Sequence, residues 1–266
     1  MAGGQDFEDM AGPVIQEGEV KVASCLYREG DVELEGVLAR PRMPGKHHGV
    51  VVVHEWMGVG PYVVRRAQQL AQLGYLALAA DVYGRSNRPS NTDEAGRIAQ
   101  SFRNDPQLIR RRMTAAVQFL QDHEDCSGQI AAIGYCFGGT CVLELVRSGA
   151  RLAGAVNLHG RLQTSLPAAR GAVHAPIQIL LGADDPLIPQ ESVQGFVEEM
   201  RQAECDWQLT LYGRTVHSFT NPEVGRDATT GFAYDPVADQ RSWAAMTAFL
   251  DECFSGTAGR TNSSIT

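Results

Sequence analysis

The sequence predicts an α/β fold in which a mainly parallel central sheet has helices on both faces and begins with an antiparallel hairpin. From residue 49 onward, short apolar segments alternate with segments of helical periodicity, which is typical of parallel sheets with crossover helices. The segments 49–53 and 75–80 are apolar throughout, as strands buried on both faces are. With 266 residues and 44% hydrophobic content, the chain can form one large core, so we expect a single domain.

The predicted elements follow one another in a regular order. Residues 20–26 and 32–38 alternate between apolar and polar side chains on either side of the turn at 28–31, which indicates the hairpin. Residues 106–121 have the periodicity of an amphipathic helix, and Pro106 suits its first turn. The remaining predicted strands are 49–53, 75–80, 130–134, 152–158, 177–181 and 207–212, and the remaining helices are 63–73, 138–148, 190–202 and 237–254, with 84–105 irregular at first and then helical.

Residues 18–254 are expected to form the domain, with a flexible segment at 1–17 and a flexible tail at 255–266. The first residues are acidic and glycine-rich, and they lack the basic and apolar parts of a signal peptide. No apolar run reaches the roughly 18–20 residues that a membrane helix requires. We therefore expect a cytoplasmic protein with no membrane partner.

Charge and cysteine content narrow the range of partners. The net charge is −8, from 31 acidic and 23 basic residues, and no basic stripe is present, which argues against nucleic acid as a partner. The six cysteines include no Cys-x-x-Cys pair, so we expect free thiols and no disulfide framework. The expected partner is a small molecule, and the expected assembly is a monomer or a small homo-oligomer.

The segment Gly134-Tyr135-Cys136-Phe137-Gly138 has the Gly-x-Cys-x-Gly pattern of a nucleophile elbow, with a thiol at its apex. An apolar strand turns abruptly into a helix there, and glycines are needed on both sides because side chains would collide with the neighbouring strand and helix. The helix N-terminus favours a thiolate and a developing oxyanion. Taken alone, the pattern fits a buried structural cysteine equally well.

A cysteine nucleophile needs a base and an orienting carboxylate, since only a few per cent of a free thiol is ionised at pH 7. His217 follows the predicted strand 207–212, and Asp184 and Asp185 follow the predicted strand 177–181. Both loops lie at strand ends where the elbow is expected, and the order nucleophile, acid, histidine is that of α/β-hydrolases. These residues predict a Cys-His-Asp triad in which either aspartate can be the acid.

Five motifs together carry a resemblance to a known family. They are His54-Glu55-Trp56-Met57-Gly58-Val59, Asp81-Val82-Tyr83-Gly84-Arg85, Gly134-Tyr135-Cys136-Phe137-Gly138-Gly139, Gly182-x-x-Asp185-x-x-x-Pro189 and His217-Ser218-Phe219. On these motifs the chain resembles the dienelactone hydrolase family of the α/β-hydrolase superfamily, from about residue 20 to residue 254. The resemblance implies a single α/β-hydrolase domain. It also makes Asp185 the acid, because the family's acid stands three residues after the glycine and four before the proline.

The resemblance also assigns a catalytic role to Glu55, since the family uses a glutamate on the loop after an early central strand. A carboxylate there can accept the thiol proton and keep the resting nucleophile neutral until substrate arrives. The alternative is a loop carboxylate paired with a nearby arginine. By the family's geometry, the backbone amides of Trp56 and Phe137 form the oxyanion hole.

For substrate binding, the resemblance implies that Arg85 pairs with a substrate carboxylate, the alternative being a solvated loop residue. A second arginine is expected four residues after His217, but Asn221 occupies that position. Loss of one charge-assisted partner costs about 1.5–3 kcal/mol, or roughly tenfold to over a hundredfold in affinity. The sequence therefore does not predict dienelactone itself as the substrate. His159 ends a predicted strand, and the sequence leaves open whether it lines the pocket or has a structural role.

The sequence thus predicts a cofactor-free hydrolase of small esters or lactones that acts through an acyl-enzyme thioester. No phosphate loop or dinucleotide fingerprint is present, and His54-Glu55 lacks the second histidine of a zinc motif, so neither a cofactor nor a metal is expected. One alternative is a broad carboxylesterase or thioesterase without a lactone preference. The other is a ligand receptor that keeps the pocket and does not turn over.

Overall fold

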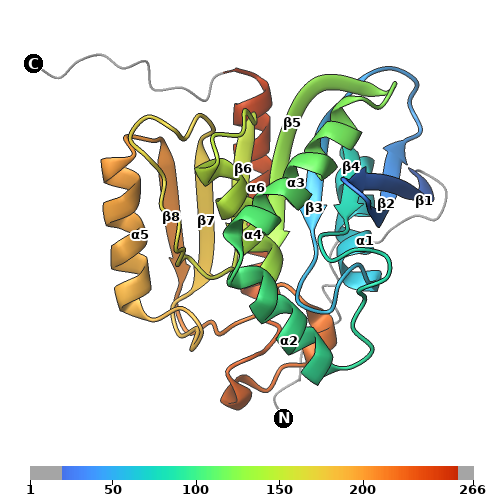
Figure 1. Ribbon diagram of the computed structural model, residues 1–266. Helices are drawn as coiled ribbons and strands as arrows, with labels where there is room; N and C mark the ends of the chain where they lie inside the picture. The colour runs from blue at the N-terminus through green and yellow to red at the C-terminus, as the bar shows by residue number, and fades with distance from the viewer. Residues whose placement is uncertain (1–19, 257–266) are drawn as a thin grey trace, which may run out of the picture.

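Eight strands form the central sheet of the computed structural model, which describes residues 20–256 (Figure 1). Their order across the sheet is β1-β2-β4-β3-β5-β6-β7-β8. The strands are β1 (Val20–Glu29), β2 (Val32–Pro41), β3 (His47–Val53), β4 (Leu76–Ala80), β5 (Cys126–Tyr135), β6 (Gly154–Leu158), β7 (Ile177–Gly182) and β8 (Trp207–Tyr212). The segment expected to be flexible at 1–17 and most of the tail expected at 255–266 lie outside the described residues.

The sheet changes direction only at its N-terminal side. β1 and β2 pair antiparallel along their whole length, and β2 also runs antiparallel to β4. All other neighbours, from β4 through β3 to β8, are parallel. The carboxyl ends of six strands therefore meet at one edge of the sheet, and the loops after them share that edge.

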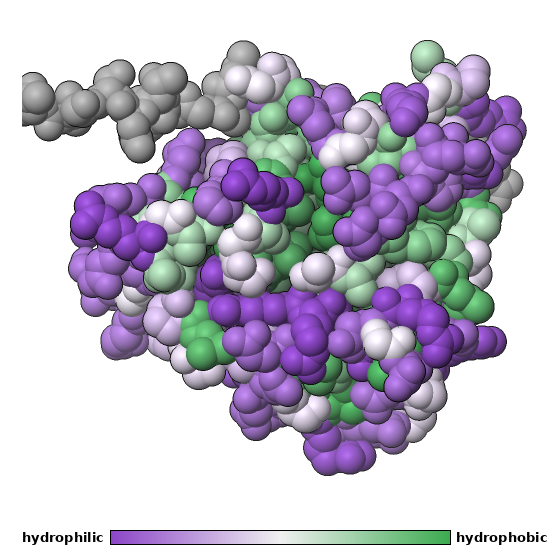
Figure 2. Space-filling view, turned by 45° about the horizontal axis from the view of Figure 1, so that its top comes forward, coloured by the Kyte–Doolittle hydropathy of each residue, from purple (hydrophilic) through white to green (hydrophobic). Residues whose placement is uncertain are grey.

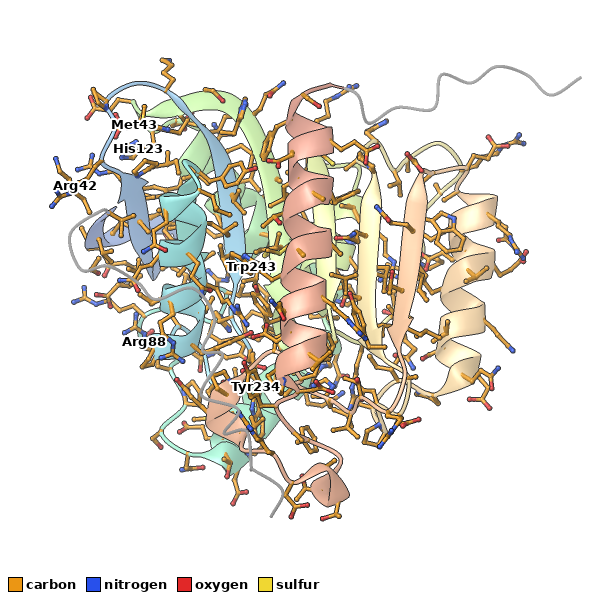
Figure 3. The ribbon with its side chains drawn as sticks, turned by 180° about the vertical axis from the view of Figure 1, so that it is seen from behind. Arg42, Met43, Arg88, His123, Tyr234 and Trp243 are labelled. Carbon is orange, nitrogen blue, oxygen red and sulfur yellow. The ribbon has the colours of Figure 1, made fainter. Side chains whose placement is uncertain are left out.

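Helices cover both faces of the sheet, which confirms the predicted α/β class. α1 (Pro61–Gln72) and α6 (Pro236–Phe254) pack on one face, where Figure 3 shows them from behind with Trp243 of α6 turned toward α1. The other face carries α2 (Thr92–Arg103), α3 (Pro106–Gln121), α4 (Phe137–Arg147) and α5 (Gln190–Gln202). Two apolar layers result, one on each side of a sheet whose inner strands are buried.

Local sequence signals explain where several helices begin. Asn91, Asp105 and Asp235 each precede a helix, and their side chains accept hydrogen bonds from amides of the first turn. α1, α3 and α6 also begin with a proline, which needs no acceptor at that position.

On the face seen in Figure 2 the surface is mostly hydrophilic, and apolar side chains show in the hollows between polar ones.

The structure differs from the sequence prediction at the start of β5. This strand begins at Cys126, four residues before the predicted 130, and residues 127–129 are exposed. An exposed strand end carries no apolar run, so periodicity could not reveal it. Two short 3₁₀ helices, η1 (Pro222–Val224) and η2 (Ala228–Thr230), were also not predicted, because each consists of a single turn without a buried face.

Candidate active site

Cys136 stands at the turn between β5 and α4, at the carboxyl edge of the sheet. Its backbone φ is 52°, in the left-handed region that non-glycine residues rarely adopt. A Cβ on Gly134 would overlap the carbonyl oxygen of Gly138, and a Cβ on Gly138 would overlap that of Val53. The turn therefore closes only with glycine at both positions, which is the physical reason for the Gly-x-Cys-x-Gly pattern.

Cys136, His217 and Asp185 form one hydrogen-bonded chain. Nε2 of His217 lies 3.1 Å from Sγ of Cys136, and Nδ1 of His217 lies 2.7 Å from Oδ2 of Asp185. The three side chains are buried and come from the loops after β5, β8 and β7. The structure thus brings together the three residues that the sequence singled out as nucleophile, base and acid.

Asp185, and not Asp184, faces the histidine. The second carboxylate oxygen of Asp185 accepts the backbone N–H of Leu187 at 2.8 Å, which fixes the side chain. Asp184 is exposed, and its backbone N–H donates to the carbonyl of Thr215 at 3.0 Å. A Cβ on Gly182 would overlap that same carbonyl of Thr215, so glycine is required where the acid loop begins.

The loop that carries His217 is held by backbone pairing. The N–H of His217 donates to the carbonyl of Gly231, and its carbonyl accepts the N–H of Ala233, each at 3.1 Å. Burial disfavours the imidazolium, but the adjacent Cys136 sulfur and the hydrogen bond to Asp185 outweigh it and raise the pKa of His217 to about 10. A positive charge on this ring is therefore stabilised where a neighbouring thiolate would form.

Two backbone amides near the sulfur are unpaired. The N–H groups of Trp56 and Phe137 have no acceptor among the described residues. Phe137 is the first residue of α4, where a helix leaves its amides without intrahelical partners. Two donors without acceptors, one of them on the residue directly after Cys136, are what the predicted oxyanion hole requires.

Glu55 lies on the loop after β3 and lines the same pocket as Cys136. One carboxylate oxygen accepts the side-chain amide of Asn221 at 2.6 Å, and the other is 3.5 Å from the hydroxyl of Ser218. Burial raises the pKa of Glu55 above its ordinary value, although the hydrogen bond from Asn221 works against the shift. No described arginine pairs with Glu55, so the neutral amide of Asn221 is its main partner.

The pocket that contains Cys136 has a volume of about 660 Å³, within the usual range for small-molecule sites. Its lining includes Glu55, Tyr62, Leu187 and Asn221. Four large apolar side chains that line it are also exposed to solvent, namely Trp56, Met57, Val224 and Phe232. We refer to these four residues as the apolar rim. A substrate with a hydrophobic part would gain contact area there.

The structure does not bring Arg85 to the other predicted site residues. Its guanidinium is exposed and pairs with Glu33 at 2.7 Å and with Glu35 at 3.5 Å, both on β2. The arginines that line the pocket are Arg103 and Arg161, which sequence reasoning missed. Arg103 is the last residue of an amphipathic helix, and nothing in the sequence marks that position as part of a site. Arg161 follows the end of a strand, which is the signal that could have indicated it.

His159 lies behind the nucleophile, at the end of β6, with a backbone φ of 43°. Its Nδ1 accepts the backbone N–H of Cys136 at 3.1 Å, so its Nε2 carries the proton and donates to the hydroxyl of Thr220 at 2.7 Å. The hydroxyls of Thr220 and Tyr62 are 2.6 Å apart. Burial lowers the pKa of His159 well below its ordinary value, which keeps this ring neutral.

Metal-ligand clusters and membrane-spanning helices are both absent from residues 20–256. No group of three or more histidine, cysteine or carboxylate side chains in this range is arranged to hold a metal ion. Across the same part of the chain, no helix has the length and apolar character needed to cross a membrane. All six cysteines are free thiols, as the sequence predicted.

Comparison with known proteins gives a consistent family. The model of the dienelactone hydrolase family matches residues 34–254. A curated protein of Bradyrhizobium, named "Probable 2-oxo-3-(5-oxofuran-2-ylidene)propanoate lactonase", is 28% identical over 218 residues, which cover 77% of this chain and 84% of that protein.

Solved structures are also similar. The crystal structure of a dienelactone hydrolase-like promiscuous phosphotriesterase from metagenomic libraries has a TM-score of 0.82 and 35% identity, over 89% of this chain and 99% of that one. A dienelactone hydrolase from Anabaena variabilis has a TM-score of 0.62 and 20% identity, over 86% of this chain and 98% of that one. At the latter identity the likeness is one of fold.

Proposed function

Because the chain belongs to the dienelactone hydrolase family and is a hydrolase of the α/β-hydrolase fold, we propose that it cleaves small esters or lactones with Cys136 as the nucleophile. One observation carries the proposal. Sγ of Cys136, the ring of His217 and the carboxylate of Asp185 are joined by contacts of 3.1 and 2.7 Å beside a cavity of about 660 Å³. This is the geometry of an activated nucleophile.

The first half-reaction forms a thioester. The thiol proton of Cys136 moves to His217, and the thiolate attacks the carbonyl carbon of the substrate. The carbonyl π electrons move onto oxygen, and the amides of Trp56 and Phe137 stabilise this oxyanion. When the carbonyl re-forms, the C–O bond to the alcohol breaks, and the alcohol oxygen takes the proton from His217. Asp185 stabilises the intermediate imidazolium.

The second half-reaction releases the acid. Water takes the place of the alcohol, His217 accepts one of its protons, and the resulting hydroxide attacks the thioester carbon. The C–S bond breaks, Cys136 leaves as a thiolate, and the proton on His217 returns to the sulfur. In a lactone the alcohol and the acid remain in one molecule, so the product is a hydroxy acid. No step requires an added cofactor.

Glu55 acts as a second proton acceptor in the resting site. Its pKa is raised by burial, and its partner Asn221 is neutral, so a proton can reside on this carboxylate at lower cost than on an exposed one. The thiol proton of Cys136 can therefore go to Glu55 in place of His217, and the same proton then passes to the alcohol oxygen when the C–O bond breaks. The arrangement supports the role that the family resemblance gives to Glu55.

A panel of substrates tests the proposal. It comprises simple lactones, neutral aryl esters, an aryl thioester and an aryl phosphotriester, the last because a structural relative is named a phosphotriesterase. For any substrate hydrolysed by the native protein, Cys136→Ala is expected to lower kcat by at least about a thousandfold. Cys136→Ser is expected to retain a small part of the rate, because its hydroxyl ionises far less readily. Full activity in the alanine variant would contradict the proposal.

The same panel separates the alternatives. Arg85 lies outside the pocket and Asn221 replaces a second arginine, which favours a broad carboxylesterase or thioesterase over an enzyme restricted to dienelactone. Comparable kcat/KM values on lactones and open esters would support this second candidate. Stoichiometric acylation of Cys136 without further turnover would instead indicate a ligand receptor.

A further inference from the structure

Arg103 and Arg161 are the two cationic side chains that line the cavity beside Cys136. Neither guanidinium forms an ion pair with a described carboxylate, and the Nε atom of each is buried without a hydrogen-bond partner there. The guanidinium of Arg103 lies over the ring of Phe137, 5.6 Å from its centroid, next to the nucleophile. Two guanidinium groups without an ion-pair partner among the described residues thus line this cavity, whose lining also includes the carboxylates of Glu55 and Glu223.

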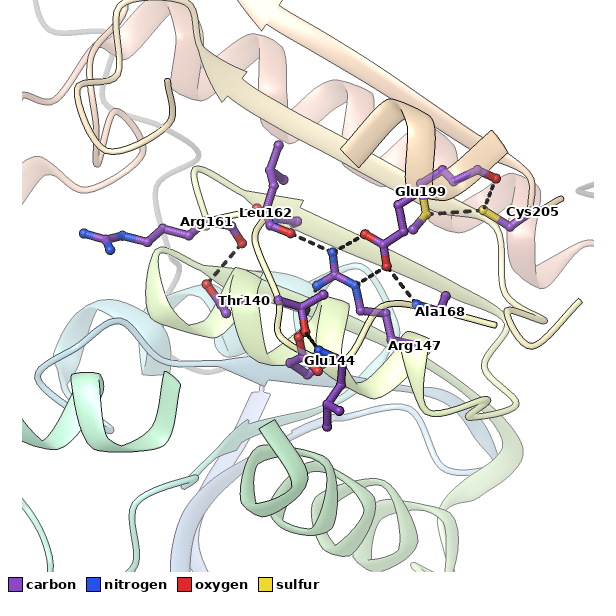
Figure 4. Close-up of polar contacts among 12 residues, drawn as sticks. Thr140, Glu144, Arg147, Arg161, Leu162, Ala168, Glu199 and Cys205 are labelled. Atoms are coloured by element: carbon purple, nitrogen blue, oxygen red, sulfur yellow. Dashed lines mark hydrogen bonds and ion pairs between the residues drawn. The ribbon is translucent and has the colours of Figure 1, made fainter. Parts of the chain in front are cut away.

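Two acidic side chains on the adjacent helices α4 and α5 pair with other arginines. Glu144 pairs with Arg110 at 2.8 Å and with Arg147 at 3.2 Å, and Glu199 pairs with Arg147 at 2.7 Å. Figure 4 shows the side chain of Arg161 extending away from this group of ion pairs, with no interaction drawn to its guanidinium. None of the ion pairs of the described residues includes Arg161, although the charges of Cys136 and Asp185 act on it from a longer distance.

The two arginines also disfavour each other. Burial and the positive charge of Arg103 lower the pKa of Arg161, and they outweigh the opposite effects of Cys136 and Asp185. Such a pair is costly unless an anion binds between its members, because a charge held out of water needs a counter-charge. An incoming carboxylate would relieve the repulsion and accept hydrogen bonds from the guanidinium groups.

Arg103 and Arg161 stand where two cavities meet. Besides the cavity of Cys136, they line a second one of about 490 Å³. The lining of the second cavity is mainly polar, with Gln100, Asn104, Thr140, Gln163, Thr164 and Ser165, and it includes Glu144, which is paired with Arg110 and Arg147. The apolar rim belongs only to the first cavity. The whole site therefore has a nucleophile, a hydrophobic wall and a cationic polar end.

We propose that Arg103 and Arg161 bind a carboxylate of the substrate, and that the preferred substrates are anionic esters or lactones with a hydrophobic part. The proposal rests on the proposed function, since it assigns the substrate class of the same site. It moves the anion-binding role from Arg85 to two residues that the family motifs do not contain. The hydrophobic part contacts the apolar rim, and the carboxylate lies between the two guanidinium groups.

A matched pair of substrates tests this assignment. The mono-para-nitrophenyl ester of glutarate carries a free carboxylate, and its methyl-capped form has the same length without the charge. The native protein is expected to prefer the free acid. Arg103→Gln and Arg161→Gln are each expected to lower kcat/KM on the free acid by roughly tenfold to a hundredfold, mainly through KM, with the capped ester affected less than about threefold.

Further variants separate charge from structure. Arg97→Gln removes the same charge from an exposed position on α2 and is expected to leave the preference intact. Arg161→Lys is expected to keep part of it, because lysine retains the charge but not the planar fork. Equal kcat/KM for the two esters in the native protein, or loss of the preference in Arg85→Gln but not in Arg161→Gln, would overturn the proposal.

A binding measurement makes the outcome independent of turnover. Calorimetric titration of glutarate into the Cys136→Ala variant is expected to show binding. The double variant with Cys136→Ala and Arg161→Gln is expected to show none. If neither these esters nor any substrate of the panel is hydrolysed, the proposed function fails, while this titration still decides whether the arginines bind a carboxylate. Equal glutarate affinity with and without Arg161 would overturn the anion site even if Cys136 hydrolyses every neutral ester.

Discussion

Glu55 is a buried carboxylate at a position where a neutral side chain would be more stable. Its hydrogen-bond partners are the amide of Asn221 and, at a longer distance, the hydroxyl of Ser218, and neither carries a positive charge. Burial therefore dominates and raises its pKa above the ordinary value of 4.5. A carboxylate in this condition is ready to take up a proton during the reaction, but it destabilises the fold. Activity and stability should therefore respond oppositely to its removal.

Glu55→Gln is accordingly expected to slow hydrolysis by roughly tenfold or more and to raise Tm at neutral pH. Because the folded protein holds the Glu55 proton more tightly than the unfolded chain, the contribution of Glu55 to stability is present below about pH 4.5 and is lost as pH rises through the folded pKa. The gain in Tm should therefore be larger at pH 7.5 than at pH 4.5. Thermal unfolding of both proteins at the two pH values measures it, and a pH-independent difference would contradict the explanation.

His159 shows a different use of burial. Its neutral ring accepts the amide of Cys136 on one side and donates to Thr220 on the other, so it can make both bonds only in one tautomer. The low pKa that burial imposes keeps the ring neutral at neutral pH, and the hydrogen bond from the Cys136 amide selects the tautomer. We interpret His159 as a positioning residue that holds the backbone of the nucleophile, and not as an acid or a base.

At the scale of elements, the turn from β5 into α4 is the most constrained part of the fold. The first turn of α4 approaches the end of β3 so closely that a Cβ on Gly138 would meet the carbonyls of Val53 and His54. The close approach places the Phe137 amide beside Cys136 on one side and near the Glu55 loop on the other. The catalytic arrangement and the packing of α4 against β3 therefore depend on the same glycine.

Gly138→Ala is expected to destabilise the protein by about 3 kcal/mol or more, because the added methyl group must displace backbone. The matched control is Gly195→Ala in the exposed middle of α5, where an added Cβ meets nothing within 4 Å. That change is expected to stabilise by about 0.5–1 kcal/mol, since alanine favours helix over glycine. Urea unfolding measures both, and similar effects at the two positions would contradict the role given to close approach.

Over the whole molecule, the parts that the sequence predicted well are those with local signals. Buried parallel strands are continuous apolar runs, and the predicted triad residues follow such runs, so chain order places Cys136, His217 and the pair Asp184-Asp185 at one sheet edge. The choice of Asp185 over Asp184 came from the family resemblance. The direction of Arg85 could not be predicted in this way. It depends on Glu33 and Glu35 of β2, which lie about fifty residues earlier in the sequence. These residues lie next to Arg85 because β2 pairs antiparallel with β4, the strand that precedes Arg85.

The same limit applies to Arg103 and Arg161. They are far apart in the sequence, and neither belongs to a motif of the family. Arg103 is the last residue of α2, and Arg161 lies in the loop after β6. Both line the same cavity, which brings them together. The absence of an ion pair at Arg103 and Arg161 within residues 20–256 is a property of the packed structure, in which Glu144, beside them in the second cavity, pairs with Arg110 and Arg147.

The six cysteines allow a last test that covers the whole chain, because only Cys136 combines a cavity with a basic partner. Burial raises the pKa of Cys25 and Cys205 to about 11 and that of Cys253 to about 12, so at pH 7.5 less than about 0.1% of each is thiolate. Cys126 and Cys141 are buried in the core. Limiting iodoacetamide at pH 7.5 is therefore expected to alkylate Cys136 first, as read by peptide mass spectrometry. The fast phase should be absent in Cys136→Ser, and earlier labelling of half-exposed Cys25 or Cys205 would show that His217 does not activate this sulfur.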